Sequence, residues 1–276
     1  MTPKPRLQTT RRDFVKWMSA GAVASLAPIS LGSYSTGCLT LEKAELRLPK
    51  WDADGFRVAL LADLHTNTPA EVMYAINAVK LAIEQKPDLI AIPGDFVNVS
   101  EPRHLGFVRQ ALEPFNDAPC PVIATLGNHD YDCRNINGIV STIRSTKVVL
   151  LQNKAVEVNG VTVAGIDDAI AHKHQTEFLA DGSFSKSLLA LLHEPDFVDV
   201  MPTNVSLQLS GHSHGGQICL PGGRPLHTPY GAWNYFAGYY PNAKVPLYVT
   251  RGVGTVGPRI RLFCLPEVNI LTLRGA

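Results

Sequence analysis

The chain has 276 residues, with 25 Lys and Arg against 24 Asp and Glu, so its formal net charge is +1. The hydrophobic fraction of 45% excludes a disordered chain, because enough apolar surface is available to form a core. The near balance of charge excludes a nucleic-acid binder that works through bulk positive charge. The length accommodates one or two domains.

The first 30 residues differ from the rest of the chain. They carry five basic residues and one acidic residue, a net charge of +4, which leaves −3 for the remainder. Arg11 and Arg12 precede a mostly apolar run from Trp17 to Leu31, which is the order of a secretory signal. The run has about 15 residues, fewer than the roughly 20 that span a bilayer. The sequence therefore predicts an export segment over residues 1–32 rather than a membrane anchor, and then a connector over residues 33–50.

The Arg pair, followed by Phe14 and Lys16, resembles the twin-arginine signals of bacteria, which direct the export of folded proteins. The resemblance implies the twin-arginine export machinery as a partner. It places the protein in the periplasm or on the outer face of the cytoplasmic membrane, with peripheral membrane association as a further expectation. Cleavage of the signal and lipidation of Cys38 stay open.

Five cysteines lie at positions 38, 120, 133, 219 and 264, and no two have the Cys-x-x-Cys spacing. This spacing disfavours a thiolate zinc site. Export would permit disulfides, although the sequence does not indicate a pairing. We expect Cys120, Cys219 and Cys264 to be small buried residues.

The first part of the body has the pattern of an α/β fold. Apolar runs at residues 56–62, 89–92 and 122–125 predict buried strands. Thr68 and Pro69 predict the start of a helix, which Pro87 ends. Further helices are predicted near residues 103–112 and 135–144. Strands that alternate with helices in this way predict parallel pairing with right-handed crossovers.

The second part of the body is richer in strands. Residues 156–163 alternate in polarity around Asn159-Gly160, a strong signal for a hairpin. Other strands are predicted at residues 188–192, 205–209, 247–250 and 268–273. We therefore expect one α/β domain over residues 51–276, in which two mixed sheets pack together with helices outside.

Polar loops follow five of the predicted strands. They are Asp63-Leu64-His65, Gly94-Asp95, Gly127-Asn128-His129-Asp130, His193 and Gly211-His212-Ser213-His214-Gly215-Gly216. Strand ends at one edge of an α/β sheet converge on a single crevice. Carboxylate, amide and imidazole groups suit Mn, Fe or Zn, and seven of the nine such groups in these loops would fit two ions that share a bridging carboxylate. The remaining histidines, at positions 104, 172, 174 and 227, are predicted to lie outside the site.

These motifs, in this order, resemble the calcineurin-like metallophosphoesterase superfamily over most of residues 50–275. The segments 215–218, 247–255, 258–261 and 266–267 add to the similarity and point to the branch of exported bacterial phosphodiesterases. The resemblance implies a four-layer α/β/β/α sandwich of two mixed sheets. It also implies a phosphate-ester substrate and two divalent metal ions as cofactors.

The resemblance assigns a role to each site residue. The implied metal ligands are Asp63, His65 and His214 for the first ion, Asn128, His193 and His212 for the second, and Asp95 as the bridge. His129 would not bind metal but would protonate the leaving oxygen, and Asp130 would orient His129. The implied reaction is hydrolysis of a phosphodiester, or of a monoester, by in-line attack of a hydroxide that bridges the ions.

Two alternatives stay open. A lipid-linked or nucleotide-sugar pyrophosphatase of the cell envelope would use the aromatic stretch 230–240 as a lipid-facing rim, although this stretch would equally form a packed loop. A non-catalytic metal-binding scaffold is disfavoured, because all seven ligands and His129 are present. One departure from the family is Asn98, which stands where many members have a second Asp and argues against the purple acid phosphatases. Arg251, Arg259 and Arg261 would contact the substrate phosphate or pair with acids.

Overall fold

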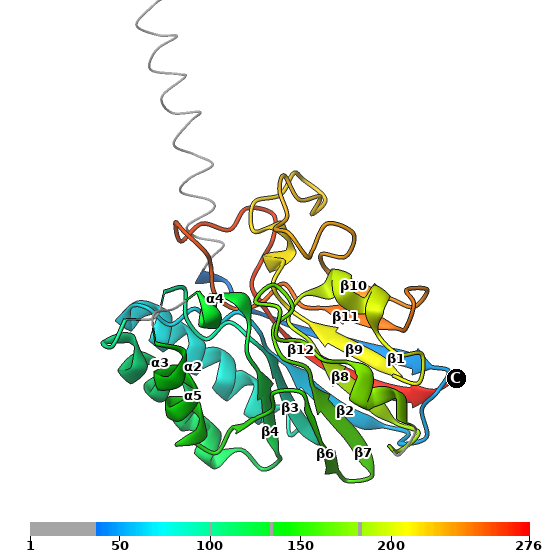
Figure 1. Cartoon of the computed structure of the whole chain (residues 1–276). Helices are drawn as coiled ribbons and strands as arrows, with labels where there is room; N and C mark the ends of the chain where they lie inside the picture. The colour runs from blue at the N-terminus through cyan, green and yellow to red at the C-terminus, as the bar shows by residue number, and fades with distance from the viewer. Residues whose placement is uncertain (1–36, 100, 133–134, 182–183) are drawn as a thin grey trace, which may run out of the picture.

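The computed structural model of the chain describes residues 37–99, 101–132, 135–181 and 184–276 (Figure 1). The predicted export segment and Cys133 lie outside the described residues. The described elements form two six-stranded sheets that pack face to face, which confirms the predicted α/β fold with two mixed sheets. Within the described ranges, no helix has the length and apolar character needed to cross a bilayer.

The first sheet carries most of the predicted front half. Its strands, in order across the sheet, are β1 (Thr40–Leu48), β12 (Glu267–Gly275), β2 (Phe56–Leu60), β3 (Leu89–Pro93), β4 (Val122–Thr125) and β5 (Val149–Leu150). Strands β2 to β5 are parallel, whereas β12 runs antiparallel to β2. Every residue of β3 and β4 is buried, which explains why both strands read as continuous apolar runs.

The second sheet carries the back half. Its order is β10 (Gly238–Tyr240), β11 (Leu247–Val249), β9 (Leu207–Ser210), β8 (Leu188–Leu191), β7 (Val161–Gly165) and β6 (Lys154–Val158). The hairpin between β6 and β7 is confirmed. Asn159 and Gly160 have φ angles of 52° and 82° at its turn, as a two-residue type I′ turn requires.

Helices cover the outer face of the first sheet (Figure 1). They are α2 (Pro69–Glu84), α3 (His104–Leu112), η1 (Glu113–Asp117), α4 (Asn128–Tyr131) and α5 (Ile136–Arg144). The N-cap of α2 is the predicted one, since the Thr68 side chain accepts a hydrogen bond from the backbone N–H of Glu71. The apolar face of these helices packs on the sheet and fixes the strand ends that carry the polar loops.

The outer layer over the second sheet differs from the expected layer of α-helices. It consists of the 3-10 helices η2 (Glu177–Asp181) and η3 (Pro195–Val200). Leu179 and Val198 from these helices are buried against the sheet, so they close the core as α-helices would. Another 3-10 helix, η4 (His214–Gly216), follows β9 and carries His214.

Strand β1 lies in the segment predicted as a connector, and this part of the prediction is corrected. Its side chains alternate between exposed Glu45 and Arg47 and buried Leu46 and Leu48, as in a half-buried strand. It pairs in parallel with β12 from Thr40 to Leu48. The domain as folded therefore begins before residue 51.

Candidate metal centre

Six acidic and imidazole side chains gather in two buried groups at the carboxyl ends of the strands. The first group is Asp63, His65 and His214, and the second is Asp95, His193 and His212. Within each group the candidate ligand atoms lie within 4.8 Å of one another. The loops come from β2, β3, β8 and β9, so both sheets contribute to the site, as the sequence predicts.

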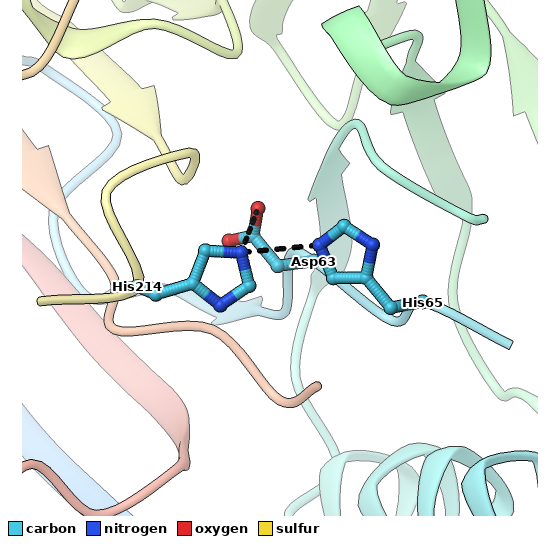
Figure 2. A group of neighbouring side chains, drawn as sticks. All are labelled: Asp63, His65 and His214. Carbon is cyan, nitrogen blue, oxygen red and sulfur yellow. Dashed lines mark hydrogen bonds and ion pairs between the residues drawn. The ribbon is translucent and has the colours of Figure 1, made fainter. Parts of the chain in front are cut away.

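The first group has the arrangement of ligands around a single cation (Figure 2). His65 Nε2 lies 3.1 Å from His214 Nε2, and His214 Nε2 lies 3.7 Å from Asp63 Oδ1. Figure 2 shows the two imidazole rings with their nitrogen atoms turned toward each other and toward the carboxylate. Such a set of nitrogen and carboxylate donors fits Mn, Fe or Zn.

Asp95 connects the two groups. Its Oδ2 atom lies 3.1 Å from His193 Nε2 in the second group and 3.7 Å from His65 Nε2 in the first. His193 Nε2 in turn lies 3.9 Å from Asp63 Oδ1. The two groups therefore form one continuous cluster, with the Asp95 carboxylate within 4 Å of a histidine of each group.

Asn128 supplies the seventh predicted ligand. Its Oδ1 atom is buried and has no hydrogen-bond partner among the described residues, and the residue lines the same cavity as Asp95. A buried amide oxygen without a partner carries a desolvation penalty, which a cation would remove. The donor set therefore fits two divalent ions.

Backbone carbonyls fix the orientation of three of the imidazole rings. His65 Nδ1 lies 3.2 Å from the Val97 carbonyl, and His193 Nδ1 lies 2.6 Å from the Pro93 carbonyl. His212 uses the other nitrogen, because its Nε2 lies 2.8 Å from the Tyr230 carbonyl. A ring that donates one N–H to a carbonyl keeps the lone pair of its other nitrogen for a metal ion.

Five of the seven candidate ligands have left-handed backbones. The φ angles are 56° at Asp63, 48° at His65, 59° at Asp95, 69° at His212 and 51° at His214. Each such residue costs about 1–3 kcal/mol and persists only where the surrounding structure holds it. In an extended strand, Asp-x-His and His-x-His would place their side chains on alternating sides, but these turns bring both members toward the cluster.

Two glycines make room for the carboxylates. A Cβ atom on Gly127 would collide with Asp95 Oδ1, and a Cβ atom on Gly252, whose φ is 71°, would lie 2.5 Å from Asp63 Oδ2. The backbone thus approaches the carboxylates more closely than any residue with a side chain allows.

The buried groups of the cluster shift one another's pKa values. Burial raises the pKa of Asp63 to about 7, and the nearby Asp95 adds to this effect. Burial alone would also raise the pKa of Asp95, but neighbouring His193 holds it well below its usual value. Burial opposes the charging of His193, yet Asp95 and Asp63 raise its pKa well above the usual value.

The remaining ligand histidines are held neutral. Burial lowers the pKa of His65 to about 3, against the attraction of Asp95. Burial and the neighbouring His65 lower the pKa of His214 well below its usual value. Burial and His193 also lower the pKa of His212. Neutral imidazole is the form that binds metal.

His129 lies at the cavity beside the cluster, and its ring stands edge-on to His65 at a centroid distance of 5.2 Å. The sequence predicts that Asp130 orients this ring. In the structure the carbonyl of Asn98 takes that position, 2.9 Å from His129 Nδ1. The buried Asp130 carboxylate accepts hydrogen bonds from the backbone N–H groups of Asp95, Phe96 and Gly127. Asp130 therefore shapes the loop that presents Asp95.

A cavity of about 460 Å³ opens over the cluster. Asp95, Asn128, His129 and His214 form part of its wall. His227, which the sequence places outside the site, also lines the cavity. The sequence around His227 contains no motif that would predict a position at the cavity.

The sequence leaves open whether three arginines contact the substrate or bind other protein groups, and two of them bind protein groups. Arg251 pairs with Glu267 and Glu42. Arg261 is fully buried, and its guanidinium donates to the carbonyls of Arg251, Gly252, Gly254 and His214. Arg261 therefore ties the segment that surrounds Asp63 to the segment that carries His214.

Comparison with known proteins agrees with this geometry. A sequence model of the calcineurin-like phosphoesterase family matches residues 56–216. The chain is 30% identical over 273 residues to phosphodiesterase YaeI of Escherichia coli K12, covering 96% of this chain and 99% of that protein. It is 29% identical over 285 residues to the uncharacterized metallophosphoesterase YkuE of Bacillus subtilis, covering 96% and 98%. An uncharacterized metallophosphoesterase of Aquifex aeolicus is 30% identical over 266 residues, covering 90% and 97%.

Proposed function

The chain belongs to the calcineurin-like phosphoesterase family, and we propose that it is a phosphodiesterase that uses two divalent metal ions. The observation that carries this proposal is the joining of two buried ligand groups through the Asp95 carboxylate. The similarity to YaeI over nearly the whole of both chains supports a diester as the substrate.

The ligand assignment follows the two groups. Asp63, His65 and His214 would hold one ion, while Asn128, His193 and His212 would hold the other, with Asp95 between them. When bound, two divalent ions lower the pKa of a water molecule at the site and neutralise charge on the phosphoryl oxygens. Asp63 and Asp95 bring a charge of −2, so a site loaded with two such ions retains positive charge for a phosphate anion.

His129 would supply the proton that the leaving oxygen needs. Its Nδ1 is engaged by the Asn98 carbonyl, which leaves Nε2 as the atom that donates. In the reaction a bond forms between a water oxygen and phosphorus, and the bond from phosphorus to the leaving oxygen breaks. The leaving oxygen takes the His129 proton, and the proton lost by the water returns the ring to its starting state.

The cavity favours a diester over a pyrophosphate. Of the described residues that line it, none is Lys or Arg. A disubstituted pyrophosphate carries two negative charges where a phosphodiester carries one, and sites for multiply charged phosphates commonly add Arg or Lys. A non-catalytic scaffold is disfavoured by the complete ligand set with His129 at the cavity.

We also propose that the protein is exported by the twin-arginine route to the periplasm or to the outer face of the cytoplasmic membrane. The support is the order of Arg11, Arg12 and the apolar run from Trp17 to Leu31.

The enzymatic proposal is tested on the purified full chain by metal analysis and by hydrolysis of bis-p-nitrophenyl phosphate. We expect two Mn, Fe or Zn ions per chain, hydrolysis that stops on chelation, and recovery when metal is returned. We expect His129→Ala to retain both ions. Its rate of hydrolysis of an alkyl phosphodiester, whose leaving group needs a proton, should fall about 10²–10⁴-fold. A protein that binds no metal, or that is inert toward phosphodiesters after metal loading, contradicts the proposal.

A further inference from the structure

The cavity has two different walls. Besides the candidate metal ligands it is lined by apolar side chains, namely Ile218, Leu226, Pro229 and Val256. A hydrolase that acted only on small or sugar-like esters would gain little from such a wall, because burial of apolar surface is favourable only for an apolar partner. The wall therefore indicates that part of the substrate is hydrocarbon.

The apolar wall continues outward onto large exposed side chains. Leu226 is 62% exposed, Tyr230 is 58% exposed and Trp233 is 63% exposed. We call these three residues the apolar rim. They belong to the loops that rise above the strand ends (Figure 1), and Tyr230 and Trp233 are in edge-to-face contact at 5.2 Å. Exposed apolar groups that are contiguous with a binding site mark a surface that meets another apolar phase.

The apolar rim is held in place by contacts from beneath. The Asp196 carboxylate accepts hydrogen bonds from the backbone N–H groups of Trp233, Asn234 and Tyr235 at 2.7, 3.0 and 3.1 Å. The Tyr230 carbonyl contacts His212 in the metal cluster. Within residues 230–240, Ala232 is buried, whereas Tyr230 and Trp233 are exposed.

The amino-terminal side of the fold meets the same edge. Thr40 N donates to the Pro266 carbonyl, and the next residue, Glu267, donates to the Gly252 carbonyl beside Asp63. The first described strand, β1, therefore begins at the edge that carries the cluster.

We propose that the substrate is an amphiphilic phosphodiester taken from a membrane surface, with its phosphate at the metal cluster and a hydrocarbon chain along Ile218, Leu226 and Val256. The lack of Lys and Arg among the described lining residues fits a substrate whose one charged group is the phosphate. The apolar rim contacts the lipid surface from which the substrate is drawn. This inference rests on the proposed phosphodiesterase activity.

The chain preference is tested with p-nitrophenyl methyl phosphate and p-nitrophenyl octyl phosphate, below the micellar concentration of the latter. We expect kcat/KM of the metal-loaded full chain to be at least about tenfold higher for the octyl ester, since each buried methylene contributes favourably. Leu226→Ser and Ile218→Ser should each reduce this preference to about threefold or less. Val200→Ser is the matched control, because Val200 is 49% exposed on η3, and it should keep the preference.

The outcomes separate this inference from the proposed function. Hydrolysis of bis-p-nitrophenyl phosphate with equal rates on both alkyl esters overturns the amphiphilic substrate and leaves the phosphodiesterase intact. No hydrolysis of any of the three esters overturns both. A lipid pyrophosphate hydrolysed faster than the octyl diester would also overturn the inference, because it would make the pyrophosphatase alternative the better one.

The membrane source is tested by Trp233 fluorescence. Phosphatidylglycerol and phosphatidylcholine vesicles are added to the full chain and to Trp233→Phe, and the two spectra are subtracted so that Trp17 and Trp51 cancel. We expect a blue shift in the difference spectrum, because an exposed indole enters a less polar phase. An unchanged difference spectrum with both vesicle types, together with retained octyl preference, would show that the substrate is taken from solution and overturn the membrane source.

Discussion

At the scale of single residues, the site contains buried polar atoms that lack a hydrogen-bond partner among the described residues. The amide oxygen of Asn128 is buried and has no hydrogen-bond partner among the described residues, and His193 faces two carboxylates. Buried polar groups normally find partners, and their absence here is costly. A bound cation would remove this cost, so the cluster as a whole favours cation binding, which no single motif in the sequence indicates.

Asn128 provides a direct test of the seventh ligand. Asn128→Ala should reduce the bound metal from two ions per chain toward one under limiting metal, because the second group then loses a donor. We expect the affinity of the weaker ion to fall about 10–100-fold or more, measured by metal titration with elemental analysis.

Asn204 is the matched control for this change. Its Oδ1 atom is also buried without a hydrogen-bond partner among the described residues, but its Nδ2 donates to the Leu179 carbonyl, away from the cluster. Asn204→Ala should therefore leave the metal content at two. Equal metal content in both variants would remove Asn128 from the ligand set.

At the scale of elements, the sequence predicts strands that are buried on both faces and hairpins whose turn requires particular residues. Strands β3 and β4 read as apolar runs because they are wholly buried, and Asn159-Gly160 identifies the hairpin by its turn chemistry. Strands β1, β5 and β10 lie at sheet edges, where short or half-exposed segments carry weak patterns.

The ligand loops were predictable for a different reason. Each ligand type follows a strand, so the order of Asp-x-His, Gly-Asp, Gly-Asn-His-Asp and Gly-His-x-His already implies one edge. The groups that orient these ligands were not predictable. The carbonyls of Val97, Pro93 and Tyr230, which contact His65, His193 and His212, belong to the backbone, and every residue type has a carbonyl.

Arg261 shows how one side chain joins two loops of the site. Its guanidinium donates to the carbonyls of Gly252 and Gly254, which surround Asp63, and to the His214 carbonyl. Arg261→Lys keeps the charge but supplies one compact donor group in place of the planar fork, so several carbonyls lose their partner. We expect metal affinity to fall about 10–100-fold and the thermal midpoint to fall, as supporting contacts of ligands are lost.

Arg259→Lys is the control, because Arg259 lies two residues away in the same segment and is exposed. It should leave both the metal affinity and the thermal midpoint near those of the wild type. A purely structural role for Arg261 would lower the midpoint of the metal-free protein but leave the metal affinity of the folded variant unchanged, and that result would contradict the positioning role.

At the scale of the whole molecule, the cluster links both sheets. Asp63 and Asp95 extend from the first sheet, and His193 and His212 from the second, so ions held between them join the two halves of the core. Five of the candidate ligands have left-handed backbones and two candidate ligands are buried carboxylates, and each of these features costs folding free energy.

Metal binding should therefore raise the unfolding temperature. A ligand that binds only the folded state at 100 times its Kd stabilises by about 2.7 kcal/mol. For a protein of this size that corresponds to a rise of about 5–10 °C for one ion, with more for two. Differential scanning calorimetry of the full chain, with chelator and then with added Mn²⁺ or Zn²⁺, measures the shift.

The bridging role proposed for Asp95 ties this temperature shift to the cluster. Asp95→Ala removes the carboxylate proposed to bind both ions, so the metal-dependent rise in unfolding temperature should fall to a few degrees or less. Asp54→Ala is the control, since Asp54 is an exposed carboxylate that pairs with Arg274 far from the cluster, and it should retain the whole rise. If Asp95→Ala shows the same rise as the wild type, the ions bind elsewhere and the two sheets are not joined through this cluster.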